Sequence, residues 1–508
     1  MKPPPRAPLP SRLKALPSAL AFPSALAFAL SLLTNPISPV AGASSPSPAI
    51  GANSAPGAVA ASPAVAADTP PPVLLLNSLA LASAQAAARA GDPSLQPPLA
   101  ALRANADAAV ARPPLTVTTK HVPPPSGDVH DYVSLSIYWW PDPANRSGTP
   151  YIQRDGFRNP EADDTARYDA NSLSRTVADV EQLALAYYLA GDERYARHAS
   201  QLVRTWFLDP DTRMNPNFRY AQIIPGRDVV RGIGIIESRR FTRVVDSVAL
   251  LSGCTCWSAA DQQGLRAWFR EFEFWLRTSP NGQMEARTTN NHAVWYDVQL
   301  ADFALFAGDI ETARQVIRAA PTARIDTQID ADGAMPRELE RTRSLHYSNF
   351  NLQAFAELAT LGQLVDIDLW IYESAPLSEP SPLKERSPLG ETPPLSEPSP
   401  TSESPAAPSP QTTLTCPSTR ASSACDNPPP SVGSIRTALD FLVPYLTTSQ
   451  PWPYDEITDV DPYQETAQTL ARAAQAYPDG PYTQLLIQVA AGHSAEDDLR
   501  LTLGYWPD

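Results

Sequence analysis

Residues 288–319, TTNNHAVWYDVQLADFALFAGDIETARQVIRA, contain the pattern that decides the fold. One apolar face recurs at helical spacing, formed by Val294, Val298, Ala301 and Leu305. This spacing predicts a helix from Ala293 to Ala307. Gly308 and Asp309 then break the pattern, and a second helical segment follows at once. The stretch therefore predicts two helices stacked through a very short connection.

The same pattern of helices joined by short breaks recurs along the chain. Helical spacing is found at Val73–Ala90, Leu99–Ala111, Asn171–Ala190, Glu193–Phe207, Ala259–Leu276, Ile310–Ala319, Asn351–Val365 and, with interruptions, from Ile435 to Ala476. The alternation typical of strands is scarce. Many helices with short connections favour a stacked all-α architecture over a sheet protein.

Two segments have a composition that cannot form a core. The chain of 508 residues contains 56 prolines, about double the usual share of roughly 5%. Residues 44–71 are rich in alanine, serine and proline, and residues 374–432 are rich in serine and proline with the motif PLSEPSP in two copies. Both segments are predicted to be disordered. Because helical patterning resumes after the second one, we interpret it as an insertion within one domain made of residues 72–373 and 433–508.

The N-terminal segment predicts export. Four basic residues precede an apolar stretch at 15–33, and the small residues at 40–43 suit a signal peptidase, so residues 1–43 are predicted to be a cleaved signal peptide. The alternative is a membrane anchor, although two prolines interrupt the stretch. The mature protein is expected to be secreted, extracellular and free of the membrane, with association with a cell wall as a finer expectation. Asn145 begins an N-glycosylation acceptor, Asn-Arg-Ser.

Charge and cysteine content restrict the partners and cofactors. A formal net charge of −15 removes the basic footprint that nucleic-acid binding needs. The cysteines fall in two close pairs, and neither has a histidine or a second pair at zinc-ligand spacing, so no metal or other cofactor is predicted. A disulfide is expected between Cys416 and Cys425, whereas the spacing of Cys254 and Cys256 is awkward for one. The sequence gives no indication of an oligomeric state.

The first candidate site lies at the entry of the helix quoted above. Asn290, Asn291 and His292 stand where a helix presents free N–H groups and the positive end of its dipole. This position favours a bound carboxylate and a neutral imidazole that can act as a base. The ordinary alternative is that Asn290 caps the helix while His292 packs in the core.

The second candidate site is the segment ELERTRSLHYSNFN at 338–351, which contains Arg341, Arg343, His346 and Tyr347. If the segment is helical, Arg343 and Tyr347 share a face. A cation beside a phenol lowers the phenol pKa, which makes Tyr347 a candidate for proton transfer. The alternative is that the two arginines hold an acidic neighbour such as Glu338 or Glu340.

A third cluster combines aromatic and amide side chains, and its members are Trp139, Trp140, Asn217, Tyr220 and Gln222. Such side chains suit sugar rings, which have an apolar face and a rim of hydroxyl groups. For any single tryptophan, packing in the core is the more common role.

Together these motifs resemble those of the alginate-lyase-domain polysaccharide lyases, more closely family thirty-eight than family five. The resemblance rests on Tyr138-Trp-Trp-Pro-Asp-Pro, Asn215-Pro-Asn, Tyr220-Ala-Gln, Asn290-Asn-His and Arg341-Thr-Arg-Ser-Leu-His-Tyr. It implies an (α/α) toroid, an incomplete barrel of helical hairpins, with an acidic polysaccharide in a groove across one end. It also implies catalytic roles, in which Asn291 neutralises a uronate carboxylate, His292 is the base, Tyr347 is the acid or the shared acid and base, and Arg341 or Arg343 stabilises the anion. The substrate-binding residues would be Trp139, Trp140, Asn217, Tyr220, Gln222, Asn290 and His346.

The residue types fit such chemistry independently. β-Elimination of a 4-linked uronate needs a neutralised carboxylate, removal of the C5 proton and protonation of the leaving oxygen, and amide, guanidinium, imidazole and phenol groups supply these functions. The sequence thus predicts a secreted lyase of alginate or glucuronan that leaves unsaturated uronate ends. Two alternatives stay open: a helical-toroid glycoside hydrolase using two of Asp330, Asp332, Glu338 and Glu340, and a non-catalytic secreted glycan-binding protein.

Overall fold

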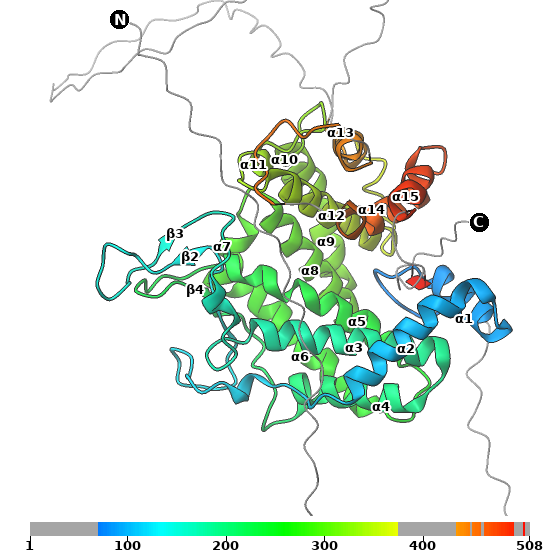
Figure 1. The fold of residues 1–508 in the computed structure, drawn as a ribbon, viewed down its shortest axis with the longest axis horizontal. Coiled ribbons are helices and arrows are strands. Elements are labelled where there is room, and N and C mark those ends of the chain that lie inside the picture. The colour runs from blue at the N-terminus through cyan, green and yellow to red at the C-terminus, as the bar shows by residue number, and fades with distance from the viewer. Residues whose placement is uncertain (1–69, 374–432, 448–449, 459–461, 492–500, 503–508) are drawn as a thin grey trace, which may run out of the picture. The chain divides into compact units, whose positions relative to one another are not determined.

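The structure, a computed structural model, describes residues 70–373, 433–447, 450–458, 462–491 and 501–502 (Figure 1). All of them belong to one compact unit that begins at Ala64. The predicted signal peptide, the insertion and both Cys416 and Cys425 lie outside the described residues, as does the predicted lead-in apart from its last two residues. The domain boundaries therefore stay predictions.

The first half of the described unit is a group of helices around an aromatic core. Its helices are α1 (Ser78–Ala90), α2 (Gln96–Val110), α3 (Ala170–Ala190), α4 (Glu193–Val203), α5 (Phe241–Leu250) and α6 (Ala259–Thr278). Helix α3 packs against α1, α2, α4 and α5. Phe241 lies fully buried in the centre and meets Trp268 edge to face, with 5.6 Å between ring centroids. Edge-to-face aromatic pairs stabilise a core beyond the effect of burying apolar surface, and they favour one arrangement of the rings.

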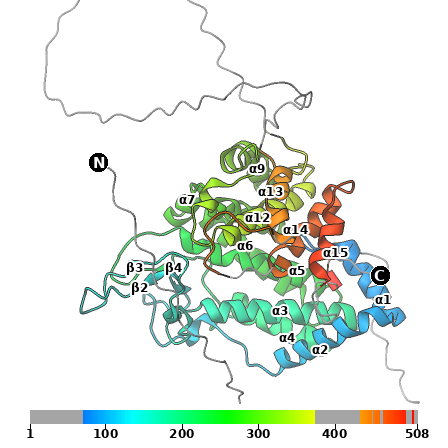
Figure 2. The same ribbon diagram turned by 45° about the horizontal axis from the view of Figure 1, so that its top comes forward.

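The second half is built around α8 and α12. Its helices are α7 (Pro280–Ala286), α8 (Asn291–Ala307), α9 (Ile310–Ala320), α10 (Asp326–Gln328), α11 (Pro336–Leu339), α12 (Ser344–Gln363), α13 (Ile435–Thr447), α14 (Pro462–Ala476) and α15 (Tyr482–Ala490). Helix α8 packs against α6, α9 and α12, and α12 packs in turn against α13 and α14. Arg472 on α14 donates to the carbonyl of Leu75, which brings the C-terminal helices next to the first described residues (Figure 2).

Short helical turns and strands complete the unit. The short helical turns are η1 (Pro93–Leu95), η2 (Val117–Thr119), η3 (Pro160–Asp163), η4 (Arg204–Leu208), η5 (Ile233–Arg240) and η6 (Pro321–Ile325). Strand β1 (Val133–Leu135) pairs in parallel with β4 (Tyr220–Ile223), and β2 (Trp139–Trp140) pairs antiparallel with β3 (Ile152–Gln153). Strands β2, β3 and β4 lie at one side of the helices in both views (Figures 1 and 2).

The predicted all-α architecture is confirmed, and the deviations have local causes. Helix α1 begins at Ser78 rather than Val73 because the buried carboxylate of Asp246 accepts hydrogen bonds from the N–H groups of residues 74–76. These N–H groups are thereby satisfied without a helix, and Asn77 then caps α1. Helix α12 begins seven residues earlier than predicted, at Ser344 rather than Asn351. The sequence patterns did not indicate α5, α7 and α15.

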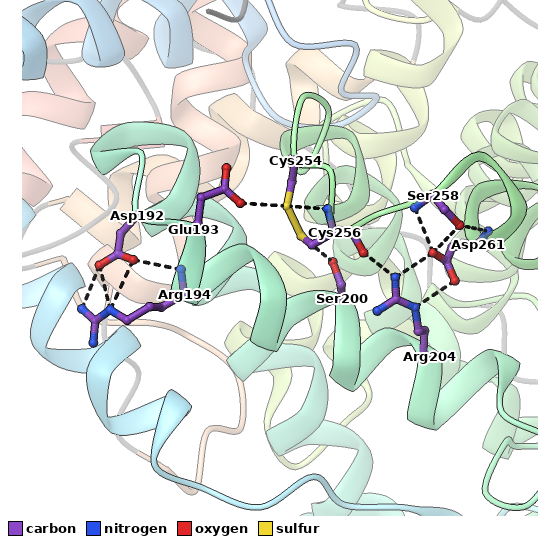
Figure 3. The surroundings of a disulfide bond; sticks show 9 residues. All are labelled: Asp192, Glu193, Arg194, Ser200, Arg204, Cys254, Cys256, Ser258 and Asp261. Atoms are coloured by element: carbon purple, nitrogen blue, oxygen red, sulfur yellow. Dashed lines mark hydrogen bonds and ion pairs between the residues drawn. A yellow bond between two sulfur atoms is a disulfide. The ribbon is translucent and has the colours of Figure 1, made fainter. Parts of the chain in front are cut away.

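The expectation for the cysteines at 254 and 256 is wrong, because they form a disulfide (Figure 3). The chain between α5 and α6 folds in successive turns, with the N–H of Cys254 bonded to Leu251 and that of Trp257 bonded to Cys254. These turns bring the two Cα atoms to 5.1 Å, inside the usual range for a disulfide. Arg204 fixes the end of the loop, because its guanidinium binds both Asp261 and the carbonyl of Cys256.

Candidate active site

A cleft of about 890 Å³ opens between the strands and the N-terminal ends of α8 and α12. Nine of the twelve predicted site residues line it: Trp139, Gln222, Asn290, Asn291, His292, Arg341, Arg343, His346 and Tyr347. Segments that are far apart in the sequence thus meet in one cavity.

Tyr347 lies one turn into α12 and has two polar partners in the cleft. Its hydroxyl lies 2.8 Å from the hydroxyl of Tyr138, which comes from the loop before β2. The guanidinium carbon of Arg341 lies 3.8 Å from the centroid of the Tyr347 ring. Arg341 is held in turn by Asp155 through two hydrogen bonds of 2.6 and 3.2 Å. The phenol is therefore fixed between a cation and a second phenol.

Burial and charge act in opposite directions on Tyr347. Burial raises the pKa of its phenol above the ordinary value, and the charge of Arg341 works against this rise. The pKa of Asp155 is below its ordinary value because the hydrogen bonds and charge of Arg341 and the hydrogen bonds of Thr342 outweigh the effect of burial. The carboxylate of Asp155 is thus kept ionised and keeps Arg341 over the ring.

The expectation that Arg343 shares a helical face with Tyr347 is wrong. Arg343 is the residue before α12, and its backbone is not helical, with φ −121° and ψ 58°. Its Nε donates to the hydroxyl of Thr458 at 3.0 Å. The acidic neighbours proposed for the arginine pair are not their partners either, because Arg341 binds Asp155.

A short segment at 455–458 supports the start of α12. The N–H of Ser344 donates to the carbonyl of Asp455 at 2.9 Å, and the N–H of Ile457 donates to that of Thr342 at 3.1 Å. The carboxylate of Glu456 accepts the N–H of His346 at 3.2 Å. The side chains just before and just inside α12 are therefore oriented by residues that follow the insertion.

The N-terminus of α8 is occupied by a carboxylate from the protein itself, not left open for a ligand as expected. Glu338, fully buried, accepts the N–H of Asn291 at 2.6 Å and its side-chain amide at 2.8 Å. Burial raises the pKa of Glu338 and the hydrogen bonds from Asn291 oppose this. One hydrogen of the Asn291 amide remains for another acceptor. Asn290 precedes the helix without making a side-chain cap.

His292 has a buried acidic partner. Its Nδ1 lies 2.6 Å from Oε1 of Glu285, a fully buried residue of α7, and the imidazole side chain is 13% exposed. A carboxylate accepts from Nδ1–H, so this contact fixes the ring and directs Nε2 away from α7. The core-histidine alternative does not hold, because His292 lines the cleft.

Three predicted residues lie away from the cleft. Trp140 donates from its indole N–H to the carbonyl of Phe157 at 2.8 Å, on the other side of the strand from Trp139. Asn217 binds Asp131 at 3.0 Å, and both Asn217 and Tyr220 line a neighbouring hollow. Their roles in binding stay predictions.

Several cleft residues were missed by sequence reasoning. Tyr138 stands beside Trp139 in a motif that was recognised, but its contact with Tyr347 spans 209 positions. Asp155 and Arg239 also line the cleft. Arg239 lies 4.9 Å from the ring of Phe350, and burial lowers the pKa of its guanidinium. Glu285 is a further partner of the site, through His292. No local pattern marks Tyr138, Asp155 and Arg239, because their partners are distant in sequence. Glu285 lies only seven positions from His292 but on the preceding helix, α7.

The described residues contain one cluster of potential metal ligands and no helix suited to span a membrane. One group there has ligand atoms within 4.8 Å of one another, Glu193 with Cys254 and Cys256, and the two sulfur atoms are already joined as a disulfide. This group does not line the cleft. None of the helices within these ranges combines the length and apolar character that crossing a membrane requires.

The chain is similar to known alginate lyases in sequence and in structure. The family model described as alginate lyase matches residues 116–377. The crystal structure of an alginate lyase from Bacteroides ovatus is 31% identical, with a TM-score of 0.71, over 85% of this chain and 99% of that one. That of alginate lyase A1-III from Sphingomonas species A1 is 16% identical, with a TM-score of 0.36, over 57% of this chain and 71% of that one. No curated protein sequence matches the chain.

The match to the Bacteroides ovatus enzyme confirms the predicted (α/α) toroid, since almost the whole of that chain superposes on this one. The family match spans the loop with Tyr138 and the starts of α8 and α12, which together form the cleft. The chain therefore belongs to the alginate lyase family and is a polysaccharide lyase acting on acidic polysaccharide.

Proposed function

We propose that the enzyme cleaves 4-linked uronate polymers, alginate or glucuronan, by β-elimination and leaves unsaturated uronate ends. The observation that carries the proposal is the placement of Tyr347, whose phenol lies in the cleft between Arg341 and the hydroxyl of Tyr138. Asn291 and His292 line the same cleft. A proton-transfer group, a cation and amide donors are thus available to one sugar.

We assign each step of the elimination to one of these groups. The free amide hydrogen of Asn291 binds the uronate carboxylate, so that negative charge developing from C5 is stabilised in the transition state. Tyr347 takes the C5 proton in its phenolate form and returns a proton to the leaving O4 where both lie on one side of the ring. Arg341 stabilises that phenolate, and His292 assists at the carboxylate or serves as a second base.

The carboxylates of the cleft support elimination over hydrolysis. Among the described residues, two carboxylate side chains line the cleft, those of Asp155 and Glu237. Asp155 pairs with Arg341. Glu237 accepts hydrogen bonds of 2.7 Å from Tyr132 and Ser134. Hydrolysis needs two opposed acids, one of them available to protonate the leaving oxygen. Asp330, Asp332, Glu338 and Glu340 do not line the cleft.

The test is to incubate the purified protein with polymannuronate, polyguluronate and glucuronan and to follow ultraviolet absorbance and reducing ends together. A lyase increases both signals, because each cleavage creates a conjugated unsaturated uronate. New reducing ends without absorbance would indicate hydrolysis. Binding of a polymer with neither signal would identify a non-catalytic glycan-binding protein, and either outcome would refute the proposal.

Replacing His292 with alanine should have an effect that depends on the substrate. In mannuronate and glucuronate, H5 and O4 are syn, so Tyr347 alone serves both, whereas in guluronate they are anti and two groups on opposite faces are needed. We expect a loss near the upper end of about 10²–10⁴-fold on guluronate linkages, if they are cleaved, and a smaller loss on the syn substrates. Comparing kcat on defined homopolymers measures this. Equal losses on all three would show that His292 has no separate role as a base.

We further propose that the enzyme is secreted and that the signal peptide is removed near Ala43. Mature protein recovered from the medium should then begin within a few residues of Ser44, because small residues precede this point. Sequencing the N-terminus by mass spectrometry tests the prediction. Membrane-bound protein that retains Met1 would establish an anchor instead. A glycan on Asn145, which lies exposed in the structure, would be a second mark of export.

A further inference from the structure

A second hollow of about 1170 Å³ adjoins the catalytic cleft. It is lined by the chain from Asn217 to Arg231 together with the end of α6 and the start of α7. Arg231 lines both this hollow and the cleft. The two spaces therefore meet at this arginine, and a bound polymer that leaves the catalytic residues in this direction passes it.

Two guanidinium groups gather at the meeting point. The guanidinium carbon of Arg227 lies 4.8 Å from the ring centroid of Trp139, and that of Arg231 lies 5.8 Å from the same ring. Among the described residues neither arginine forms an ion pair of 4 Å or less with a carboxylate. The Nε of Arg231 is buried with no partner in this part of the chain, and its Nη2 lies 3.4 Å from the hydroxyl of Ser136.

The charge of Arg231 is balanced only in part by its surroundings. Burial lowers the pKa of Arg231, and the like charge of Arg227 lowers it further, while Glu285 acts in the opposite direction. Glu285 already accepts the hydrogen bond of His292. Two like charges that face the same ring repel each other, and an anion that contacts both of them stabilises the pair.

The backbone holds both arginines in place. Arg227 closes a turn at Pro225 and Gly226, where Gly226 has φ +79° and a Cβ would come to 2.7 Å from Cα of Pro150. Next to Arg231, a Cβ on Gly232 would come to 2.6 Å from the backbone nitrogen of Glu285 on α7. Both glycines are thus needed where the chain packs tightly on its neighbours, so the backbone that carries the two arginines is positioned before any ligand arrives.

We propose that Arg227 and Arg231 form a carboxylate-binding subsite for a uronate further along the polymer than the one that is cleaved, with Trp139 positioning Arg227. The inference rests on the proposed function, because a uronate polymer carries a carboxylate on every sugar. A guanidinium pair matches this repeating planar anion. The subsite makes the enzyme favour substrates that extend beyond the catalytic cleft.

The test measures binding without turnover. In a Tyr347→Phe background, mannuronate and glucuronate hexasaccharides are titrated by calorimetry, together with the same oligosaccharides after reduction of their carboxyl groups to alcohols. Adding Arg227→Ala should raise Kd for the charged hexasaccharides about tenfold, as expected for a hydrogen bond to a charged group. Arg227 is exposed, so the variant should fold. Arg103→Ala, at an exposed arginine of α2 that lines neither hollow, is the matched control and should leave Kd within about twofold.

Three results would overturn the subsite: an unchanged Kd in Arg227→Ala, an equal loss in Arg103→Ala, or an equal loss on the carboxyl-reduced oligosaccharides. Arg231→Lys is a second test variant, because it keeps the positive charge but removes the planar guanidinium that can donate two hydrogen bonds to one carboxylate. It should weaken the binding of the charged oligosaccharides but not that of the carboxyl-reduced ones. Failure of the wild-type enzyme to cleave any polyuronate would refute the proposed function. Normal cleavage with unaltered binding in Arg227→Ala would refute the subsite while leaving the function intact.

Discussion

Replacing Tyr347 with phenylalanine should lower kcat on the best polyuronate by about 10²–10⁴-fold, and near the upper limit where the tyrosine both removes and returns a proton. The substitution deletes one oxygen and leaves the ring against Arg341. The fold should therefore survive, and circular dichroism and the melting temperature check this. KM should change little, because the phenol acts mainly in the transition state.

Tyr138→Phe is the matched control for this prediction. It removes the other hydroxyl of the 2.8 Å pair and leaves the catalytic phenol in place. We expect it to retain most of the turnover, with a loss of no more than about tenfold, the range of one neutral hydrogen bond. If Tyr347→Phe keeps more than about a tenth of wild-type turnover, less than the usual range for an acid or base, Tyr347 is structural and the assignment is wrong.

Replacing Arg341 with alanine should lower kcat by about 10²–10³-fold, the usual effect of removing one group that stabilises developing charge. The cation lies over the ring of Tyr347 and favours its phenolate. Arg343→Ala should be far milder, because Arg343 binds Thr458 rather than the tyrosine. Since the single Arg341 variant leaves Asp155 half-buried without its cation, the double variant Arg341→Ala/Asp155→Ala separates catalysis from folding.

The pH profile distinguishes this role from a purely structural one. The reactive base is the deprotonated phenol, and burial raises its pKa, so kcat/KM should rise with pH through the neutral and alkaline range. Arg341 lowers that pKa, and removing it should displace the rise to higher pH. A loss of activity in both Arg341 variants with no such displacement would contradict the assignment. A greater loss in Arg343→Ala would transfer the role to Arg343.

The sequence predicted what depends on local pattern and missed what depends on distant partners. Helix α8 and its Gly-Asp connection were recognisable because apolar spacing and glycine are local signals. The sequence did not show which of Arg341 and Arg343 lies beside Tyr347, since this depends on where α12 begins. That point is fixed by the backbone of Asp455, 111 positions from Ser344.

The electrostatic partners of the site were beyond local reasoning for the same reason. Asp155 lies 186 positions from Arg341, and Glu338 lies 47 positions from the helix end that it occupies. Any sequence that predicts a free helix N-terminus also predicts a possible anion-binding site. Whether a ligand or a buried glutamate fills it is decided by tertiary packing.

The support of α12 by residues 455–458 has a consequence for how the chain tolerates being cut. Ile435, Leu439 and Leu442 of α13 are fully buried in the same core as α12, so the parts before and after residues 374–432 are held together by packing as well as by the peptide backbone. A single proteolytic cleavage between these parts would give a two-chain enzyme whose fragments stay associated. By the same logic, a recombinant fragment that stops at residue 377, where the family match ends, would contain every proposed catalytic side chain but would lack residues 455–458, which support the start of α12.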